Sequence, residues 1–247
     1  YGLQARGLLG DQPPHATLQE AATDYLAELR QVQPHGPYLL GGYSGGGLTA
    51  WDMARQLEAA GEEVALVVLL DTPMPMRPVV SRRDKAVIKL LEFRRKGFRY
   101  LSEWAVNRYR WERAQYEKRK AGIVEEAPTD FHNVAVELAF RAALPQMQVT
   151  PRTGPAVLFR PPMDLKWQVA PGRWVSDAKE YVYPDNDWGQ YCPTLQTIDV
   201  PGDHNSMVLE PNIRTLVARL KQVIAEVERQ AQAAPPDYSP ALAQAAE

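Results

Sequence analysis

The sequence is poor in the features that mark secreted, membrane-spanning or nucleic-acid-binding proteins. Its single cysteine, Cys192, excludes an internal disulfide framework and agrees with a reducing compartment, so we expect a cytoplasmic protein. No stretch approaches the roughly 18 consecutive apolar residues of a membrane span, and the N-terminal YGLQARGLLG lacks the layout of a signal peptide. The formal net charge of -2 gives no bulk electrostatic reason to expect nucleic acid as a partner. Acyl or other small, uncharged partners remain open.

Apolar residues recur along the chain in the pattern of an α/β protein. The length of 247 residues and the apolar content of 45% suit one domain with one substantial core. Helices are predicted over 15–32, 48–61 and 213–230, and strands over 37–44, 64–71, 155–161 and 194–200. This alternation predicts a mostly parallel sheet with helices on both faces, whose ligands bind beyond the carboxyl ends of the strands. Chemically active residues should therefore follow strands.

The region between the second and third predicted strands differs in composition. Residues from about 73 to 150 are rich in Arg, Lys, Trp and Tyr at helical spacing, with breaks near Gly97, Gly122 and Pro128, and predict a helical insertion. We interpret its many positive charges as a solvated helix face, with a surface for an acidic partner as the alternative. The Ala- and Pro-rich ending, about 232–247, predicts a disordered tail.

A glycine-rich turn between the first strand and the next helix carries the motif G-x-S-x-G, as Gly42, Tyr43, Ser44, Gly45 and Gly46. Strand, turn and helix in this order form the context of a nucleophile elbow, where small neighbours are needed beside a strained serine. Glycine-rich turns also bind phosphate, but this one has neither G-x-G-x-x-G nor G-K-[ST]. We therefore interpret Ser44 as a nucleophile and the backbone N–H of Gly45 as an oxyanion donor.

A serine nucleophile needs an adjacent base, and His204 is the candidate base. It lies in the loop between the last predicted strand and the terminal helix, and it follows the serine in the chain order that hydrolase folds use. The remaining histidines are interpreted as surface or packing residues: His15, His35 and His132.

Two carboxylates are candidates for orienting the base. Asp71 closes its predicted strand and would be held rigidly, whereas Asp164 lies beyond two prolines on a loop. The sequence favours Asp71, and Asp164 stays open as the alternative. Asp203, next to the histidine, is interpreted as a loop-shaping residue.

Four segments resemble, in the same order, the thioesterase domains that end nonribosomal peptide and polyketide synthases: YGLQARG, PYLLGGYSGGG, AWDMARQLEAAGEEVALVVLLDT and VPGDHNSMVLEPNI. The resemblance implies an α/β-hydrolase fold, the acid at Asp71, and a helical lid over about 73–150 whose aromatic residues form lid core or line an acyl channel. It also implies an acyl or peptidyl thioester held on the phosphopantetheine of a carrier protein, and no metal or redox cofactor. Ser44 would accept the chain with His204 as base, and release would follow by hydrolysis or cyclisation.

Two departures from the family pattern matter. The family often has phenylalanine after the serine, so Gly45 is expected to widen the site. The family also has strands before the position of Tyr1, whose loop supplies the second oxyanion donor, so we expect that an N-terminal portion is missing and leave that donor unnamed. A free-standing editing thioesterase, another serine ester hydrolase and a non-catalytic carrier-binding module remain as alternatives.

Overall fold

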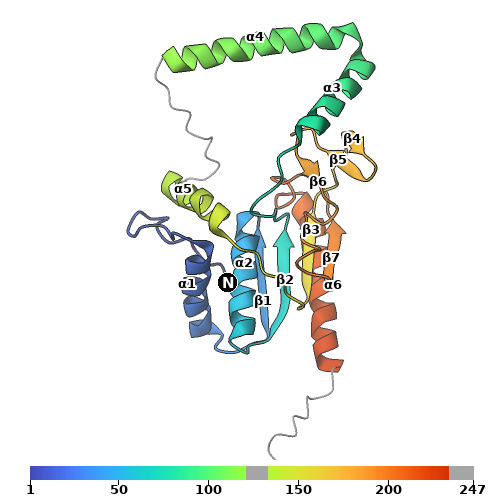
Figure 1. The fold of residues 1–247 in the computed structure, drawn as a ribbon. Coiled ribbons are helices and arrows are strands. Elements are labelled where there is room, and N and C mark those ends of the chain that lie inside the picture. Colours follow the sequence, from blue (N-terminus) through green and yellow to red (C-terminus); the bar gives the residue numbers. More distant parts are fainter. Residues whose placement is uncertain (121–132, 234–247) are drawn as a thin grey trace, which may run out of the picture.

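A four-stranded parallel sheet forms the centre of the protein (Figure 1). The computed structural model describes residues 1–120 and 133–233. The strands lie in the order β1 (Tyr38–Tyr43), β2 (Val64–Leu70), β3 (Ala156–Arg160) and β7 (Leu195–Asp199). Each coincides with a strand predicted from the sequence, and the mostly parallel α/β class is confirmed.

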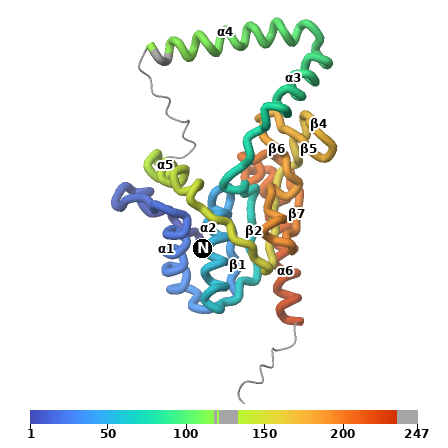
Figure 2. Tube along the Cα trace, viewed as in Figure 1, coloured from blue at the N-terminus to red at the C-terminus, as the bar shows by residue number. Residues whose placement is uncertain are grey.

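Helices cover both faces of this sheet (Figure 2). α1 (Leu18–Val32) and α2 (Gly45–Ala59) lie on one face, and α6 (Asn212–Ala233) lies on the other. The alternation of side chains along β2 produces this division, because Val67 and Leu69 join the core under α1 and α2 while Leu66 and Val68 join the core under α6. All four side chains are buried, which stabilises the fold by about 1.5–3 kcal/mol for each.

The helix that follows the serine, α2, is fixed at its end and along its side. Gly61 adopts a φ of 81° just beyond α2, and its N–H donates to the Glu58 carbonyl at 3.1 Å, which ends the helix. Trp51 packs against Trp188 from the loop after β6, with ring centroids 4.6 Å apart and both side chains fully buried. This pair ties α2 to a loop that also reaches the active site.

The segment between β2 and β3 is helical in the part that the structure describes. It forms α3 (Arg82–Lys96), α4 (Phe98–Lys120), α5 (Val134–Ala143) and the short 3-10 helix η1 (Leu144–Gln146). Gly97, with a φ of 60°, separates α3 from α4 as predicted. The predicted breaks at Gly122 and Pro128 lie outside the described residues. Figure 1 shows that α4 projects away from the sheet, whereas α5 returns toward it.

Aromatic side chains of α4 are exposed instead of buried. Four of them are between 53% and 83% exposed: Trp111, Tyr109, Tyr116 and Phe98. The expectation that aromatic residues of the insertion form a lid core is wrong for these four, because α4 extends from the sheet and packs mainly against α3. Ion pairs one turn apart, such as Arg108 with Glu112, agree with the solvated face that the charge pattern predicts.

A second sheet, which we did not predict, lies beside α3. β4 (Trp167–Ala170), β5 (Arg173–Val175) and β6 (Tyr181–Val182) pair antiparallel. Trp167 Nε1 donates to Glu92 of α3 at 2.8 Å, and the Tyr181 hydroxyl donates to Asp84 of α3 at 2.6 Å. These strands have two to four residues, too few for an alternation pattern to be recognised in the sequence.

The terminal helix α6 extends to Ala233, so the predicted tail, from about 232, begins with helical residues. Residues 234–247 lie outside the part that the structure describes. Among residues 1–120 and 133–233, no helix has the length and apolar character needed to cross a membrane.

Candidate active site

Ser44 occupies a strained turn between β1 and α2. Its φ of 51° and ψ of -124° lie in a region that residues with a Cβ rarely adopt, at a cost of about 1–3 kcal/mol. The neighbouring strand holds this turn, because the Ser44 N–H donates to the Leu70 carbonyl at 2.9 Å. Gly42 is required for steric reasons, since a Cβ there would lie 2.1 Å from the carbonyl carbon of Gly46. These features together form a nucleophile elbow.

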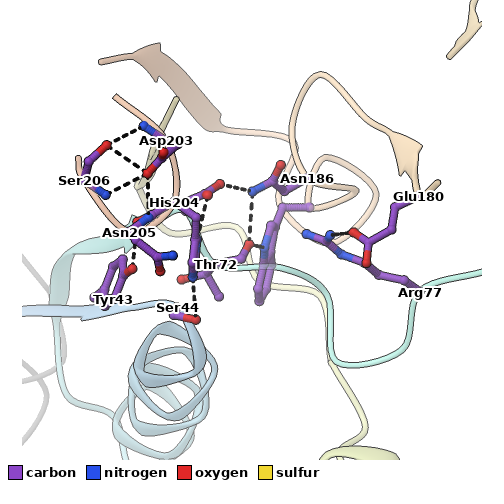
Figure 3. A network of polar contacts seen from close by, with 12 residues as sticks. Tyr43, Ser44, Thr72, Arg77, Glu180, Asn186, Asp203, His204, Asn205 and Ser206 are labelled. Atoms are coloured by element: carbon purple, nitrogen blue, oxygen red, sulfur yellow. Dashed lines mark hydrogen bonds and ion pairs between the residues drawn. The ribbon is translucent and has the colours of Figure 1, made fainter. Parts of the chain in front are cut away.

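The side chains of Ser44, His204 and Asp71 form a continuous hydrogen-bonded chain. Figure 3 shows the part of this chain that joins Ser44 and His204. His204 Nε2 lies 3.1 Å from Ser44 Oγ, and His204 Nδ1 lies 2.8 Å from Asp71 Oδ2. Although Ser44 is the N-cap of α2, its hydroxyl makes no capping bond and remains available to the imidazole. The three residues follow β1, β7 and β2, whose parallel arrangement brings them to one edge of the sheet. The structure thus brings together the three residues predicted for catalysis.

Asp71 is held rigidly at the end of β2. Its φ is 43°, and its N–H donates to the Phe159 carbonyl at 2.7 Å. Its Oδ1 accepts a hydrogen bond from Asn186 Nδ2 at 2.9 Å, while Oδ2 faces His204. Burial alone would raise the pKa of the Asp71 carboxyl, but hydrogen bonds from His204 and Asn186 outweigh it and leave the pKa below its usual value. The carboxylate therefore stays ionised at neutral pH and can orient the imidazole.

The loop that carries His204 is fixed from two directions. The Tyr43 hydroxyl donates to the His204 carbonyl at 2.7 Å, and the two rings stack with centroids 5.1 Å apart. Asp203 Oδ1 accepts hydrogen bonds from the N–H groups of Ser206 and Asn205 at 2.8 and 3.1 Å, and these bonds lower the pKa of Asp203. Asp203 therefore shapes the loop, as its position beside the histidine predicts.

Asp164, the alternative acid, lies apart from this chain of hydrogen bonds. Its Oδ2 accepts the N–H of Asp177 at 2.6 Å, in the segment that flanks β4 and β5. The geometry places Asp71, and not Asp164, against His204.

Two of the other histidines pair with carboxylates of their own. His15 Nε2 lies 3.0 Å from Asp24 Oδ2, and His35 Nδ1 lies 3.1 Å from Glu62 Oε1. His132 lies outside the described residues.

Gly45 is the first residue of α2, so its N–H is one of those that a helix leaves without an intrahelical acceptor. At the positive end of the helix dipole, this N–H is placed to stabilise a negative oxygen beside Ser44. The expectation that Gly45 widens the site is wrong. A Cβ on Gly45 would lie 2.2 Å from Cζ of Phe140, so a ring from α5 fills the space beside the glycine.

The site is built from hydroxyl, imidazole, carboxylate and backbone amide groups. Within residues 1–120 and 133–233, no group of three or more His, Cys, Asp or Glu side chains could hold a metal ion. Cys192 is buried, with its Sγ 3.3 Å from Thr194 Oγ1. The arrangement can supply a nucleophile, a base, an orienting carboxylate and an oxyanion donor, which are the groups that acyl transfer requires.

Sequence analysis missed three residues that support this site. Asn186, in the loop after β6, holds Asp71, and Trp188 from the same loop donates its Nε1–H to the Thr72 carbonyl at 2.8 Å. The third, Phe140, reaches the elbow from α5. The available signal for the loop was the cluster of turn-forming residues at 185–189, in which Asn186 adopts a φ of 51°. No comparable signal marks Phe140.

Comparison with known proteins agrees with the geometry. Residues 1–102, which include Ser44 and Asp71, match the family model described as the thioesterase domain. The resemblance to thioesterase domains is therefore confirmed.

Sequences similar to this thioesterase-like chain belong to much longer proteins. Malpinin synthetase from Mortierella alpina is 56% identical over 85 residues, which are 34% of this chain and 1% of the synthetase. The non-reducing polyketide synthase PKS1 from Zymoseptoria tritici is 28% identical over 227 residues, which are 91% of this chain and 10% of the synthase. The chain thus spans no more than 10% of the length of these two relatives.

A solved thioesterase structure shares the fold. The NocB thioesterase domain from the nocardicin cluster superposes with a TM-score of 0.52 at 20% identity, covering 90% of this chain and 80% of that domain. At this identity the likeness shows the fold alone. The α/β-hydrolase fold of thioesterase domains is therefore confirmed for this chain.

Proposed function

We propose that this protein is a serine thioesterase that releases an acyl or peptidyl chain from a carrier protein. The observation that carries the proposal is the hydrogen-bonded chain from Ser44 through His204 to Asp71, on a strained elbow in a thioesterase-like sequence. A similar sequence in a polyketide synthase supports a substrate that is held as a thioester.

Acylation begins when Ser44 Oγ attacks the thioester carbonyl. His204 Nε2, 3.1 Å from the hydroxyl oxygen, takes its proton as the bond forms. The carbonyl oxygen becomes negative and accepts a hydrogen bond from the Gly45 N–H. The carbon–sulfur bond then breaks, the leaving thiolate takes the proton from His204, and an ester with Ser44 remains. Asp71 stabilises the imidazolium that exists between the two proton transfers.

Release repeats these roles with a new nucleophile. Water, or a hydroxyl or amine of the bound chain, loses a proton to His204 Nε2 and attacks the ester carbonyl. The Ser44 oxygen leaves and recovers the proton from the imidazolium. The product is a free acid if water attacks and a ring if the chain attacks itself.

The proposed reaction needs neither a metal nor a redox cofactor, because protein groups make every proton transfer. The partner is a carrier protein whose phosphopantetheine arm brings the thioester to Ser44. The unpaired, buried Cys192 suits a reducing compartment, and we place the reaction in the cytoplasm.

Intact-mass spectrometry after incubation with acyl-N-acetylcysteamine thioesters tests the proposal. The wild type should gain the mass of the acyl group or turn the thioester over, and Ser44→Ala should lose at least about 10³-fold in rate. Ser102→Ala is the matched control, because it removes a hydroxyl from the exposed helix α4 and should behave as the wild type.

A fluorophosphonate probe supplies the second readout, since it labels an activated serine without any thioester. Wild type should be labelled at Ser44, and Ser44→Ala should not. If the wild type neither reacts with thioesters nor takes the label, the catalytic proposal fails and a carrier-binding role replaces it. Turnover by Ser44→Ala at the wild-type rate would assign the reaction to another nucleophile.

A further inference from the structure

The ring of Phe140 rests against Gly45, the residue that follows the proposed nucleophile. An ideal Cβ on Gly45 would lie 2.2 Å from Phe140 Cζ, 2.7 Å from Cε1 and 3.1 Å from Cε2. Cβ atoms in proteins essentially never approach other atoms within 3.0 Å. The tip of the ring therefore occupies the volume that a side chain at position 45 would fill.

α5 is fixed where it delivers this ring. Asn133 caps the first turn of α5, and its Nδ2 also donates to the carbonyls of Gly7 and Leu8 at 3.1 and 3.0 Å. Toward the other end of the helix, Phe140 and Leu144 pack against the core that α1 and α2 share. The ring is thus held by a helix that is attached at both ends.

This placement brings the ring next to the proposed oxyanion donor. A Cβ lies about 2.5 Å from the backbone nitrogen of its own residue, so Phe140 Cζ is within about 5 Å of the Gly45 nitrogen. A carbonyl oxygen that accepts a hydrogen bond from this N–H lies about 2.9 Å from the nitrogen, and the next acyl carbon follows two bonds later. The ring tip and the carbonyl oxygen thus both lie within about 5 Å of the Gly45 nitrogen, so the ring is a neighbour of the acyl group that this N–H binds.

We propose that Phe140 determines which acyl chains the site accepts. The inference rests on the proposed thioesterase function and narrows its substrate class to acyl chains without a branch at the carbon next to the thioester carbonyl. Of the peptidyl chains, this class keeps only those that end in glycine. A substituent on that carbon meets the ring, and the packing of α5 restrains the ring from moving away. Because Gly45 has no side chain, the side chain that limits the acyl group beside it comes from a separate helix, α5.

The ratio of kcat/KM for butyryl- and isobutyryl-N-acetylcysteamine tests this inference. The wild type should prefer the linear chain, and Phe140→Ala should shift the ratio about tenfold toward the branched one. Leu138→Ala is the matched control, because Leu138 is on the same helix but 56% exposed, and it should leave the ratio unchanged. The same ratio in Phe140→Ala as in the wild type would overturn the inference.

A pair of substitutions tests the shared space directly. Gly45→Ala should lower kcat/KM for both thioesters, because its Cβ collides with the ring, and adding Phe140→Ala should recover at least about tenfold of the loss. Absence of recovery would show that the glycine and the ring do not compete for one volume. Phe140→Leu, which keeps most of the apolar contact, replaces Phe140→Ala if that variant melts too early for assay.

Two fluorophosphonates, with an n-propyl and an isopropyl group on phosphorus, separate this inference from the proposed function. Labelling of Ser44 needs the nucleophile but no thioester turnover. If thioesters are inert while both probes label, the thioesterase proposal fails, and the labelling ratio still decides on Phe140. A shift toward the isopropyl probe in Phe140→Ala supports the inference, and an unchanged ratio overturns it.

Discussion

Two glycines of the elbow, Gly42 and Gly46, should respond in opposite ways to the same substitution. A Cβ on Gly42 would lie 2.1 Å from the carbonyl carbon of Gly46, 2.3 Å from its oxygen and 2.4 Å from the nitrogen of Gly47. A Cβ on Gly46 would meet no atom within 4 Å. Gly42→Ala and Gly46→Ala therefore form a matched pair within one motif.

The expected magnitudes follow from these distances. Ordinary contact begins at 3.4 Å, so Gly42→Ala must displace the start of α2 by about 1.3 Å, and the atoms that must move are backbone. Overpacking costs about 1–3 kcal/mol when side chains can adjust, so we expect a loss of about 3 kcal/mol or more here. Gly46→Ala should raise the free energy of unfolding by about 0.5–1 kcal/mol, because alanine is the better helix former.

Urea unfolding followed by tryptophan fluorescence measures both changes, since Trp51 and Trp188 are fully buried. Fluorophosphonate labelling of Ser44 gives the functional readout. It should slow about 100-fold in Gly42→Ala, because a shift of about 1 Å misplaces the serine and the oxyanion donor. The reasoning is refuted if Gly42→Ala unfolds at the urea concentration of the wild type, or if Gly46→Ala is the more destabilised of the two.

The residues that hold the base and the acid make two further predictions. Asn186→Ala should raise the pKa of Asp71 by removing a hydrogen bond to its ionised form. The depressed pKa of Asp71 stabilises the fold at pH values above its pKa in the unfolded chain, about 3.9, and this stability is lost as pH falls through the pKa in the folded protein. In a titration from pH 6 to about pH 2, Asn186→Ala should therefore begin to unfold at higher pH than the wild type. An unchanged acid transition would exclude this role for Asn186. Tyr43→Phe keeps the ring beside His204 but loses the 2.7 Å hydrogen bond to its carbonyl, so unfolding should become about 1 kcal/mol easier and Ser44 labelling slower. Unchanged values in both assays would show that the hydroxyl does not hold the loop.

The local pattern of apolar residues was sufficient to predict the parallel sheet and the helices that cover it. Strands such as β2, buried on both faces, appear in the sequence as continuous apolar runs. The helices that connect such strands appear as segments with apolar residues at helical spacing. The small sheet of β4, β5 and β6 escaped prediction because its strands are too short to show a period. The direction of α4 also escaped, because a helical pattern does not indicate what, if anything, packs against its aromatic residues.

By itself, the sequence determined the elbow at Ser44 and the candidate base at His204. Ser44 lies in a glycine-rich strand–turn–helix, and His204 lies in a loop after the last strand. The chain order alone reveals both contexts. The sequence favoured Asp71 over Asp164, and the tertiary structure placed Asp71 against His204. Only the tertiary structure supplied Asn186 as the second partner of Asp71 and placed Phe140 in the space beside Gly45. The physical reason is that these contacts join residues far apart in sequence, and their distances depend on strand order and on how the loops and α5 return to the sheet.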